Sequence, residues 1–250
     1  MTAETGLNRI FFALGGSARY QDPPKTMGGL EVPVQLSELR DYEDEKGNKI
    51  KVGQNVKFTS STLLIKDRGA IIEIGNNVTL PRNQIEVGHN SKLVISDGCT
   101  ISGKITVGYN SRIEIGSGLS VTGNLTIRAV ESTSIEIGDD CLFGSDIIIR
   151  TADGHPVYDA YSRERINHSK SISIGHHVWI ADRVVVLKGA DIGNASAVGV
   201  GSVLTKSIGC NCVAVGNPAR IVRTGVMWER SPGIRTEEYY LDDERARAET

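Results

Sequence analysis

An internal repeat is the feature that most constrains the fold of this chain. Residues 86–105 align without a gap on residues 106–125, which gives a period of 20. Towards the C-terminus the period shortens to 18, the spacing between Ile174-Gly175 and Ile192-Gly193, and six-residue steps emerge. Fixed periods of this length are typical of a solenoid, in which each repeat is one supersecondary unit.

Each six-residue step supplies one inward aliphatic residue, while glycine or another small residue relaxes the bend between flat faces. Three steps close one triangular coil, which cannot bury its own aliphatic side chains. Stacked coils bury them together and pair the backbone amides of successive rungs. We therefore predict an all-β solenoid that begins near Val52. An ordinary β-sandwich or barrel of short strands is the alternative.

Breaks in the repeat divide the chain into segments. Residues 151–170 interrupt the period with glycine, proline, tyrosine and charged residues, which predicts an excursion loop. Pro218 ends the repeat because proline lacks the amide that a further rung would need. We expect residues 1–51 to cap the first coil, residues 52–223 to form the solenoid, and residues 224–250 to form an extension that is partly helical or flexible.

Composition narrows the range of partners. The chain has 28 Lys plus Arg and 30 Asp plus Glu, so no bulk charge favours nucleic acid or an anionic membrane. The four cysteines match no zinc module and no dense disulfide framework, which fits a reducing compartment. The chain starts without a secretory signal pattern and has no run of about 18 apolar residues. We expect a soluble, cytoplasmic protein without a nucleic-acid partner or an integral membrane segment.

His155 is the first candidate for chemistry. It lies in the predicted loop between Gly154 and Pro156, where a turned backbone can project the ring into a cleft. A histidine side chain has an ordinary pKa near 6.5, which suits a general base at neutral pH. The alternative is a surface histidine without function.

Trp179 is the second candidate, and it is one of only two tryptophans. It occupies a position where the repeat normally has a small residue, so the ring should point outward. It could form a wall for a thioester, with a backbone N–H nearby to stabilise an oxyanion. Packing under the excursion loop is the alternative. Because His155 precedes Trp179 by 24 positions, both could face a shared cleft between rungs.

The histidines also raise the possibility of zinc, which some solenoids bind between subunits. The candidates are His89, His168, His176 and His177. Adjacent residues of a strand point to opposite faces, so His176 and His177 cannot both ligate one ion without distortion. We expect no metal. Cations near the end of the repeat could instead meet the phosphates of a nucleotide-bearing co-substrate, or form a solvated rim.

Four motifs in order give the chain a resemblance to a known family. They are Asp153-Gly-His155-Pro-Val, Ile174-Gly-His-His-Val-Trp179-Ile, Gly199-Val-Gly-Ser-Val-Leu-Thr205-Lys206 and Gly216-Asn-Pro-Ala-Arg220-Ile-Val-Arg223. Together they resemble the hexapeptide-repeat acyltransferases, and most of all the galactoside, maltose and capsular polysaccharide O-acetyltransferases. The resemblance is strong over about residues 135–223 and looser over residues 52–134.

The resemblance implies a left-handed parallel β-helix and a homotrimer with acetyl-CoA, a co-substrate, in the groove between neighbouring solenoids. It implies that His155 is the catalytic histidine and that Trp179 lines the acetyl end as part of the catalytic and donor-binding site. The other positions that match donor contacts are Asp182, Val200, Thr205, Lys206, Arg220 and Arg223. Ala181, Asp182 and Val200 depart from the Gly, Ser or Ala that the family often has there.

The expected reaction is direct transfer of an acetyl group to a sugar hydroxyl of a surface polysaccharide or its precursor. Residues that could hold this carbohydrate acceptor are Tyr158, Tyr161, Arg163 and Arg165 of the predicted loop. Three alternatives remain open at this point: N-acetylation of an amino sugar nucleotide, a zinc enzyme like the gamma-class carbonic anhydrases, and a solenoid that binds without catalysis.

Overall fold

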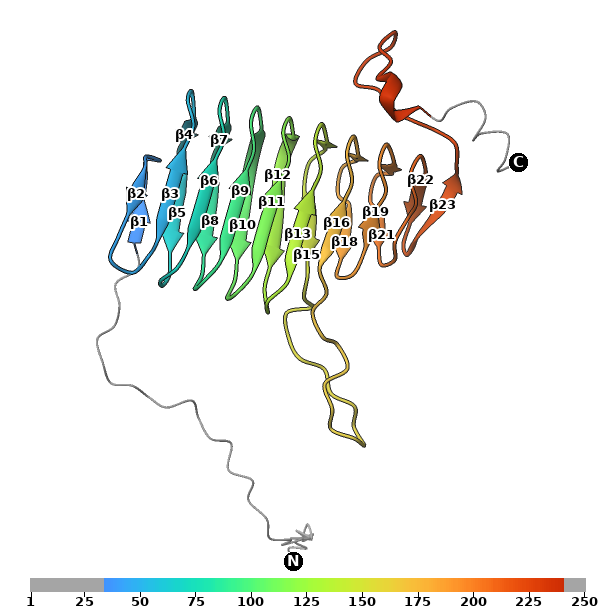
Figure 1. The fold of residues 1–250 in the computed structure, drawn as a ribbon. Coiled ribbons are helices and arrows are strands. Elements are labelled where there is room, and N and C mark those ends of the chain that lie inside the picture. Colours follow the sequence, from blue (N-terminus) through green and yellow to red (C-terminus); the bar gives the residue numbers. More distant parts are fainter. Residues whose placement is uncertain (1–33, 241–250) are drawn as a thin grey trace, which may run out of the picture. The chain divides into compact units, whose positions relative to one another are not determined.

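The computed structural model describes residues 34–240, and these residues form a solenoid of parallel strands (Figure 1). The predicted parallel β-helix is thereby confirmed. The predictions for residues 1–33 and 241–250, which belong to the expected cap and extension, lie outside the described residues. No helix of residues 34–240 has the length and apolar character needed to span a membrane.

The strands stack on three faces of a prism. The first face contains β4 (Lys57–Thr59), β7 (Thr79–Pro81), β14 (Leu142–Phe143), β17 (Trp179–Ile180), β20 (Ala197–Val198) and β22 (Val213–Gly216). The second contains β5 (Thr62–Ile65), β8 (Asn83–Val87), β15 (Ile147–Arg150), β18 (Val185–Leu187) and β21 (Val203–Leu204). The long strands β10 (Thr100–Val107) and β12 (Ser120–Ala129) run through both, which joins these faces into one 15-stranded sheet.

The third face is a separate sheet of eight strands. It contains β2 (Tyr42–Glu43), β3 (Lys49–Val52), β6 (Ile71–Ile74), β9 (Lys92–Ile95), β11 (Arg112–Ile115), β13 (Ser134–Ile137), β16 (Ile172–Ile174) and β19 (Asp191–Ile192). Parallel pairing on this face begins with β3 on β6, three residues before the predicted start at Val52. β2 pairs antiparallel with β3, and β1 (Val34–Leu36) pairs antiparallel with β5.

Register between coils explains the core. On the third face, Leu93, Ile113 and Ile135 occupy matching positions of successive strands, and all three are fully buried. The polar residues between them point outward, as the two-residue period of a strand requires. Each coil therefore buries its aliphatic row only against the next coil, and truncating one such isoleucine to alanine costs about 2–5 kcal/mol.

The corners differ from the expectation that glycine relaxes the bend. Gly138 and Gly175 of the Ile-Gly steps have no positive φ, whereas the residue two positions later does: φ is 54° at Asp140 and 52° at His177. A Cβ on Gly138 would lie 2.7 Å from the carbonyl carbon of Gly175 in the next coil. These glycines are thus required by the close approach of the neighbouring backbone, and the bend itself falls on the later residue.

Two segments leave the prism, and both flank the predicted site. The excursion loop connects β15 to β16, and the amide of Lys170 donates to the carbonyl of Thr151 at 3.0 Å to close its neck. At the C-terminal end β23 (Ala219–Arg223) turns back on β22, and the chain continues to the 3-10 turn η1 (Glu237–Tyr239). In Figure 1 the loop and this C-terminal segment project from opposite edges of the prism.

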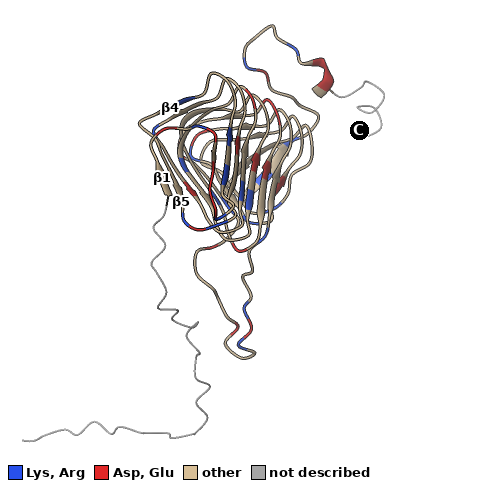
Figure 2. Cartoon of the chain, turned by 60° about the vertical axis from the view of Figure 1, so that its left-hand side comes forward, with Lys and Arg blue, Asp and Glu red and all other residues tan. Residues whose placement is uncertain are grey.

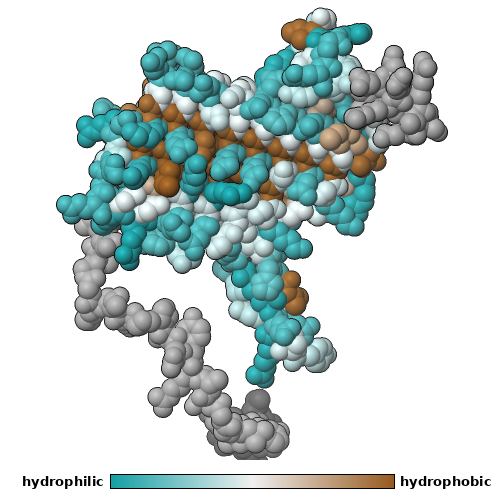
Figure 3. Space-filling view, viewed as in Figure 1, coloured by the Kyte–Doolittle hydropathy of each residue, from teal (hydrophilic) through white to brown (hydrophobic). Residues whose placement is uncertain are grey.

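The outer surface has mixed character. Figure 2 shows acidic and basic residues interspersed along the coils and at the tip of the excursion loop. Figure 3 shows apolar residues gathered in a band along the coils, bordered on both sides by hydrophilic residues. The mixture of charges agrees with the formal net charge of −2.

Candidate functional site

His155 lies on the outgoing arm of the excursion loop. His155 is exposed, and its imidazole forms no hydrogen bond or ion pair with any other residue between 34 and 240. Gly154, directly before it, has a φ of +100°, which a residue with a side chain rarely adopts. The backbone therefore turns at Gly154 as the sequence predicted, and the ring is free to meet a partner from outside this chain.

The loop is an ordered hairpin. Tyr158 pairs with Arg165 across an antiparallel bridge, and the amide of Ile166 donates to the carbonyl of Val157 at 2.9 Å. Arg165 reaches the root of the loop, where its Nη2 atom lies 2.8 Å from Oε2 of Glu131. Hydrogen bonds from Ser169 and then from Arg165 lower the pKa of Glu131 below its usual value.

These contacts show which of the predicted acceptor-binding residues are free to meet a ligand and which one is already engaged. Arg165 is engaged with Glu131 in a structural ion pair. Tyr158 and Tyr161 are 58% and 97% exposed, and the Arg163 side chain is also exposed. Three of the four candidates are therefore available to a ligand on the loop surface, whereas Arg165 would first have to leave its carboxylate.

Trp179 begins β17 on the first face and is 41% exposed, so the ring points outward as predicted. Its neighbours in the sheet are Leu142 and Ala197. The residue next to its ring is Trp228 of the C-terminal segment, with ring centroids 6.2 Å apart. The alternative of packing under the excursion loop therefore fails, because a different segment borders this ring.

His155 and Trp179 do not share a cleft within one chain. The excursion loop stands where the second face passes into the third, an edge that we call the loop edge. Trp179 follows the corner at Gly175–His177, where the third face passes into the first; we call this the clasp edge. β16 separates the two along the chain. The two residues therefore lie at different edges of the prism.

The predicted donor-binding residues lie at the C-terminal end of the solenoid. Asp182 and Val200 occupy the corner between the first and second faces, where Oδ1 of Asp182 accepts from the Ser145 amide at 2.7 Å. Val200 is 60% exposed between two glycines. The exposed polar residues at this end, predicted to follow the co-substrate towards its phosphates, are Thr205, Lys206, Arg220 and Arg223.

The histidine pair at the clasp edge divides between surface and interior. The His176 side chain is 49% exposed, and its Nδ1 atom accepts the amide of Asp139 at 3.0 Å. The His177 side chain is 1% exposed. Within residues 34–240 no group of three or more metal-ligating side chains is found, and the cysteines there form no disulfide.

His177 is the centre of a contact that the sequence did not predict. Its ring lies between the rings of Trp228 and Tyr239, with centroids 4.3 Å and 4.6 Å away and nearly parallel planes. Its Nδ1 atom lies 2.6 Å from Oδ2 of Asp140, and its Nε2 atom lies 2.9 Å from the carbonyl oxygen of Trp228. Trp228 in turn donates from Nε1 to the carbonyl of His177 at 2.7 Å. We call this group the clasp.

Asp140 links the clasp to a second cation. Arg230 donates from Nη2 to Oδ1 of Asp140 at 2.8 Å. Partial burial raises the pKa of Asp140, but hydrogen bonds from Arg230 and from His177 outweigh burial and leave this pKa below its usual value. The C-terminal segment is thereby held beside Trp179.

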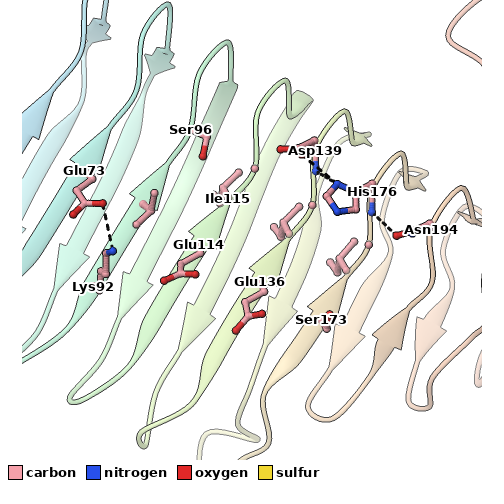
Figure 4. Close-up of a pocket in the computed structure, with 16 residues that line it drawn as sticks. Glu73, Lys92, Ser96, Glu114, Ile115, Glu136, Asp139, Ser173, His176 and Asn194 are labelled. Carbon is pink, nitrogen blue, oxygen red and sulfur yellow. Dashed lines mark hydrogen bonds and ion pairs between the residues drawn. The ribbon is translucent and has the colours of Figure 1, made fainter. Parts of the chain in front are cut away.

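A groove of about 640 Å³ lies on the third face, away from all the predicted site residues (Figure 4). The residues that line it include Glu73, Glu114 and Glu136, and it continues past His176 to Asn194. Among the side chains drawn there, Lys92 pairs with Glu73 at 3.4 Å. The groove follows the glycine corners, where the missing side chains leave the surface hollow.

The chain is similar to several known acetyltransferases. No protein-family model matches it. It is 35% identical over 143 residues to the polysialic acid O-acetyltransferase of Neisseria meningitidis. This match covers 57% of this chain and 66% of that protein. It is 37% identical over 94 residues to the galactoside O-acetyltransferase of Escherichia coli K12, which covers 38% of this chain and 46% of that protein. The chain thus spans about half to two thirds of these relatives.

A solved structure gives a longer match. A crystal structure described as that of a polysialic acid O-acetyltransferase superposes with a TM-score of 0.71 at 32% identity, covering 76% of this chain and 95% of the other. The agreement in both sequence and fold confirms the resemblance carried by the four motifs. The chain belongs to the hexapeptide-repeat acyltransferase family.

Proposed function

We propose that the chain is an acetyl-CoA-dependent O-acetyltransferase that acts on a sugar hydroxyl of a surface polysaccharide or its precursor. The observation that carries the proposal is His155: an exposed imidazole without a partner among residues 34–240, on a hairpin loop, at the motif position of the family's catalytic histidine. Relatives named as O-acetyltransferases of polysialic acid and of galactosides support the reaction class.

The chemistry requires one base and one oxyanion site. The His155 imidazole takes the proton of the acceptor hydroxyl while the hydroxyl oxygen attacks the thioester carbonyl carbon. A backbone N–H beside the groove that holds acetyl-CoA between neighbouring solenoids stabilises the tetrahedral oxyanion. When the C–S bond breaks, the imidazolium returns the proton to the leaving thiolate. The products are an acetyl ester and a free thiol, and no acyl-enzyme forms.

The separation of His155 from Trp179 supports a homotrimer in which each site is shared. The excursion loop of one copy would present His155 to the groove that holds the donor beside Trp179 of its neighbour. Lys206, Arg220 and Arg223 are exposed, and their charge and donor groups suit the phosphates of the co-substrate. Closed cyclic assemblies repeat one such contact between every pair of neighbours.

The acceptor that we propose is an acidic polysaccharide. Arg128 and Arg150 are matched in register on the second face, directly before the excursion loop, and both are exposed. Neither guanidinium forms a hydrogen bond or a close ion pair among residues 34–240, although the charge of Arg150 helps to lower the pKa of Asp153. Two exposed cations beside the loop suit a repeating carboxylate, which agrees with the polysialic acid named for a relative.

Replacement of the base tests the proposal. We expect His155→Ala to lower kcat by about 10²–10⁴-fold and to leave the affinity for acetyl-CoA nearly unchanged, because the ring acts in proton transfer and not in donor binding. Release of free thiol in the presence of polysaccharide acceptors measures kcat. His168→Ala, at an exposed histidine of the same loop, is the matched control and should retain full turnover.

The same assay separates the alternatives. Thiol release with amino acceptors but not with hydroxyl acceptors would identify an N-acetyltransferase. Stoichiometric zinc in the purified protein would favour the hypothesis of a zinc enzyme like the gamma-class carbonic anhydrases. Unchanged turnover in His155→Ala would show that another residue is the base.

A further inference from the structure

The Asn167 side chain ties together both arms of the excursion loop around His155. Its Nδ2 atom donates to the carbonyl oxygen of His155 at 2.8 Å and to Oδ2 of Asp153 at 2.9 Å. Its Oδ1 atom accepts the amide of Val157 at 2.6 Å. The Asn167 side-chain amide therefore contacts His155 and also Asp153 and Val157, which lie two positions before and after it.

Lys188 connects this amide to the solenoid. It follows β18, the strand that pairs with β15 at the root of the loop. Its Nζ atom lies 2.5 Å from Oδ2 of Asp153 and 3.1 Å from the carbonyl oxygen of Asn167, and its side chain is only 19% exposed. Hydrogen bonds from Lys188 and then from Asn167 lower the pKa of Asp153 below its usual value. The rigid coil thus fixes the neck of the loop.

The His155 ring has no such support from the described residues. Its imidazole forms no hydrogen bond with any residue between 34 and 240, and the nearby Asp153 carboxylate is already occupied by Lys188 and Asn167. The position of the base therefore depends on its backbone, and the His155 carbonyl is held by Asn167.

We propose that Asn167 is a positioning residue for His155: its Nδ2 group fixes the backbone of the base, and Lys188 anchors it through Asp153. This inference rests on the proposed function, in which His155 is the base. A displacement of about 1 Å at a reacting group can cost about 10²-fold in rate, so the bond to the His155 carbonyl should matter for kcat beyond its effect on loop stability.

An exchange of two side chains separates positioning from neck closure. In the double variant Asp153→Asn with Asn167→Asp, the new amide at position 153 can donate to the new carboxylate at position 167, and Lys188 can pair with that carboxylate. The carboxylate also still accepts the Val157 amide. The neck contacts are retained with reversed polarity, but the His155 carbonyl loses its donor because a carboxylate has none.

We expect the double variant to keep wild-type protection of the Val157 amide against hydrogen exchange, while kcat falls about 10–10²-fold and the KM for acetyl-CoA is unchanged. Asp153→Asn alone leaves the Asn167 donor to the His155 carbonyl in place, so its loss of kcat should be smaller than that of the double variant. Ser162→Ala, which removes a hydrogen bond at the tip of the same loop, is the control for general loosening.

Wild-type kcat in the double variant would overturn the proposal, since Asn167 would then act only by closing the neck. If the exchange leaves the Val157 amide unprotected, Asn167→Ala compared with Asp153→Asn decides. A larger loss of kcat in Asn167→Ala supports positioning, and equal losses contradict it. His155→Ala, measured alongside, reports on the base itself: turnover that survives His155→Ala refutes the proposed function whatever the variants at position 167 show.

Discussion

At the scale of single residues, His177 is buried and is contacted at both ring nitrogens and on both ring faces. Both ring nitrogens face oxygen acceptors, the Asp140 carboxylate and the Trp228 carbonyl, and both ring faces are covered by aromatic rings. The ring is thus held by two oxygen atoms at its nitrogens and by two aromatic rings on its faces. His177 therefore acts in structure, although its motif lies beside the predicted site.

Removing the Asp140 side chain should weaken the clasp. Asp140→Ala leaves the buried His177 Nδ1 atom without its acceptor, and a buried group left unpaired costs about 1–3 kcal/mol. Docking of the C-terminal segment can be followed by Trp228 fluorescence in a Trp179→Phe background, since the chain has only two tryptophans. Asp140→Asn, which keeps an acceptor for His177, is the control and should lose less.

The same residue gives docking a pH dependence with a defined sign. Because the folded pKa of Asp140 is lowered, its contribution is fully present above pH 3.8, the ordinary value, and is lost as pH falls below 3.8 through the lowered pKa. Asp140→Asn should show no such loss in that window. If docking weakens equally in the wild type and in Asp140→Asn below pH 3.8, the titrating group is not Asp140.

At the scale of elements, the clasp shows what sequence patterns miss. The residues after the last rung contain few apolar side chains, which predicted an extension that is partly helical or flexible. The structure instead docks them through contacts between residues 51 and 90 positions apart in the chain, namely His177 with Trp228 and Asp140 with Arg230. The adjacent histidines His176 and His177 were the local signal in the sequence, but one sequence shows neither the burial of His177 nor its distant partners.

The C-terminal segment should shield Trp179. Trp228→Ala leaves Trp179 as the sole tryptophan and removes the ring 6.2 Å away, so its emission should move to longer wavelength and its quenching by iodide should increase. The reference is Trp228→Phe, which keeps a ring over His177 but loses the Nε1 donor. Identical Trp179 emission in both variants would mean that Trp228 does not border this ring in solution.

At the scale of the whole molecule, the repeat predicted most of the fold. The six-residue steps indicated flat faces, corners and one aliphatic row per face, and rows such as Leu93, Ile113 and Ile135 are buried as expected. The left-handed winding came from the family resemblance, because periodicity carries no hand. Likewise the roles of His155 and Trp179 came from motifs, while the contacts of Asn167 depend on a loop shape that no period specifies.

A mixing experiment tests most directly whether one active site is shared by two copies. His155→Ala and Trp179→Ala chains, carrying different tags, are refolded together, and the mixed assemblies are isolated and assayed. If His155 of one copy works with Trp179 of its neighbour, each mixed trimer contains one site with both residues, so the isolated mixed assemblies recover about a third of the sites, although each variant alone is nearly inactive. Activity no higher than that of the separate variants would place the site within a single chain and contradict the shared site.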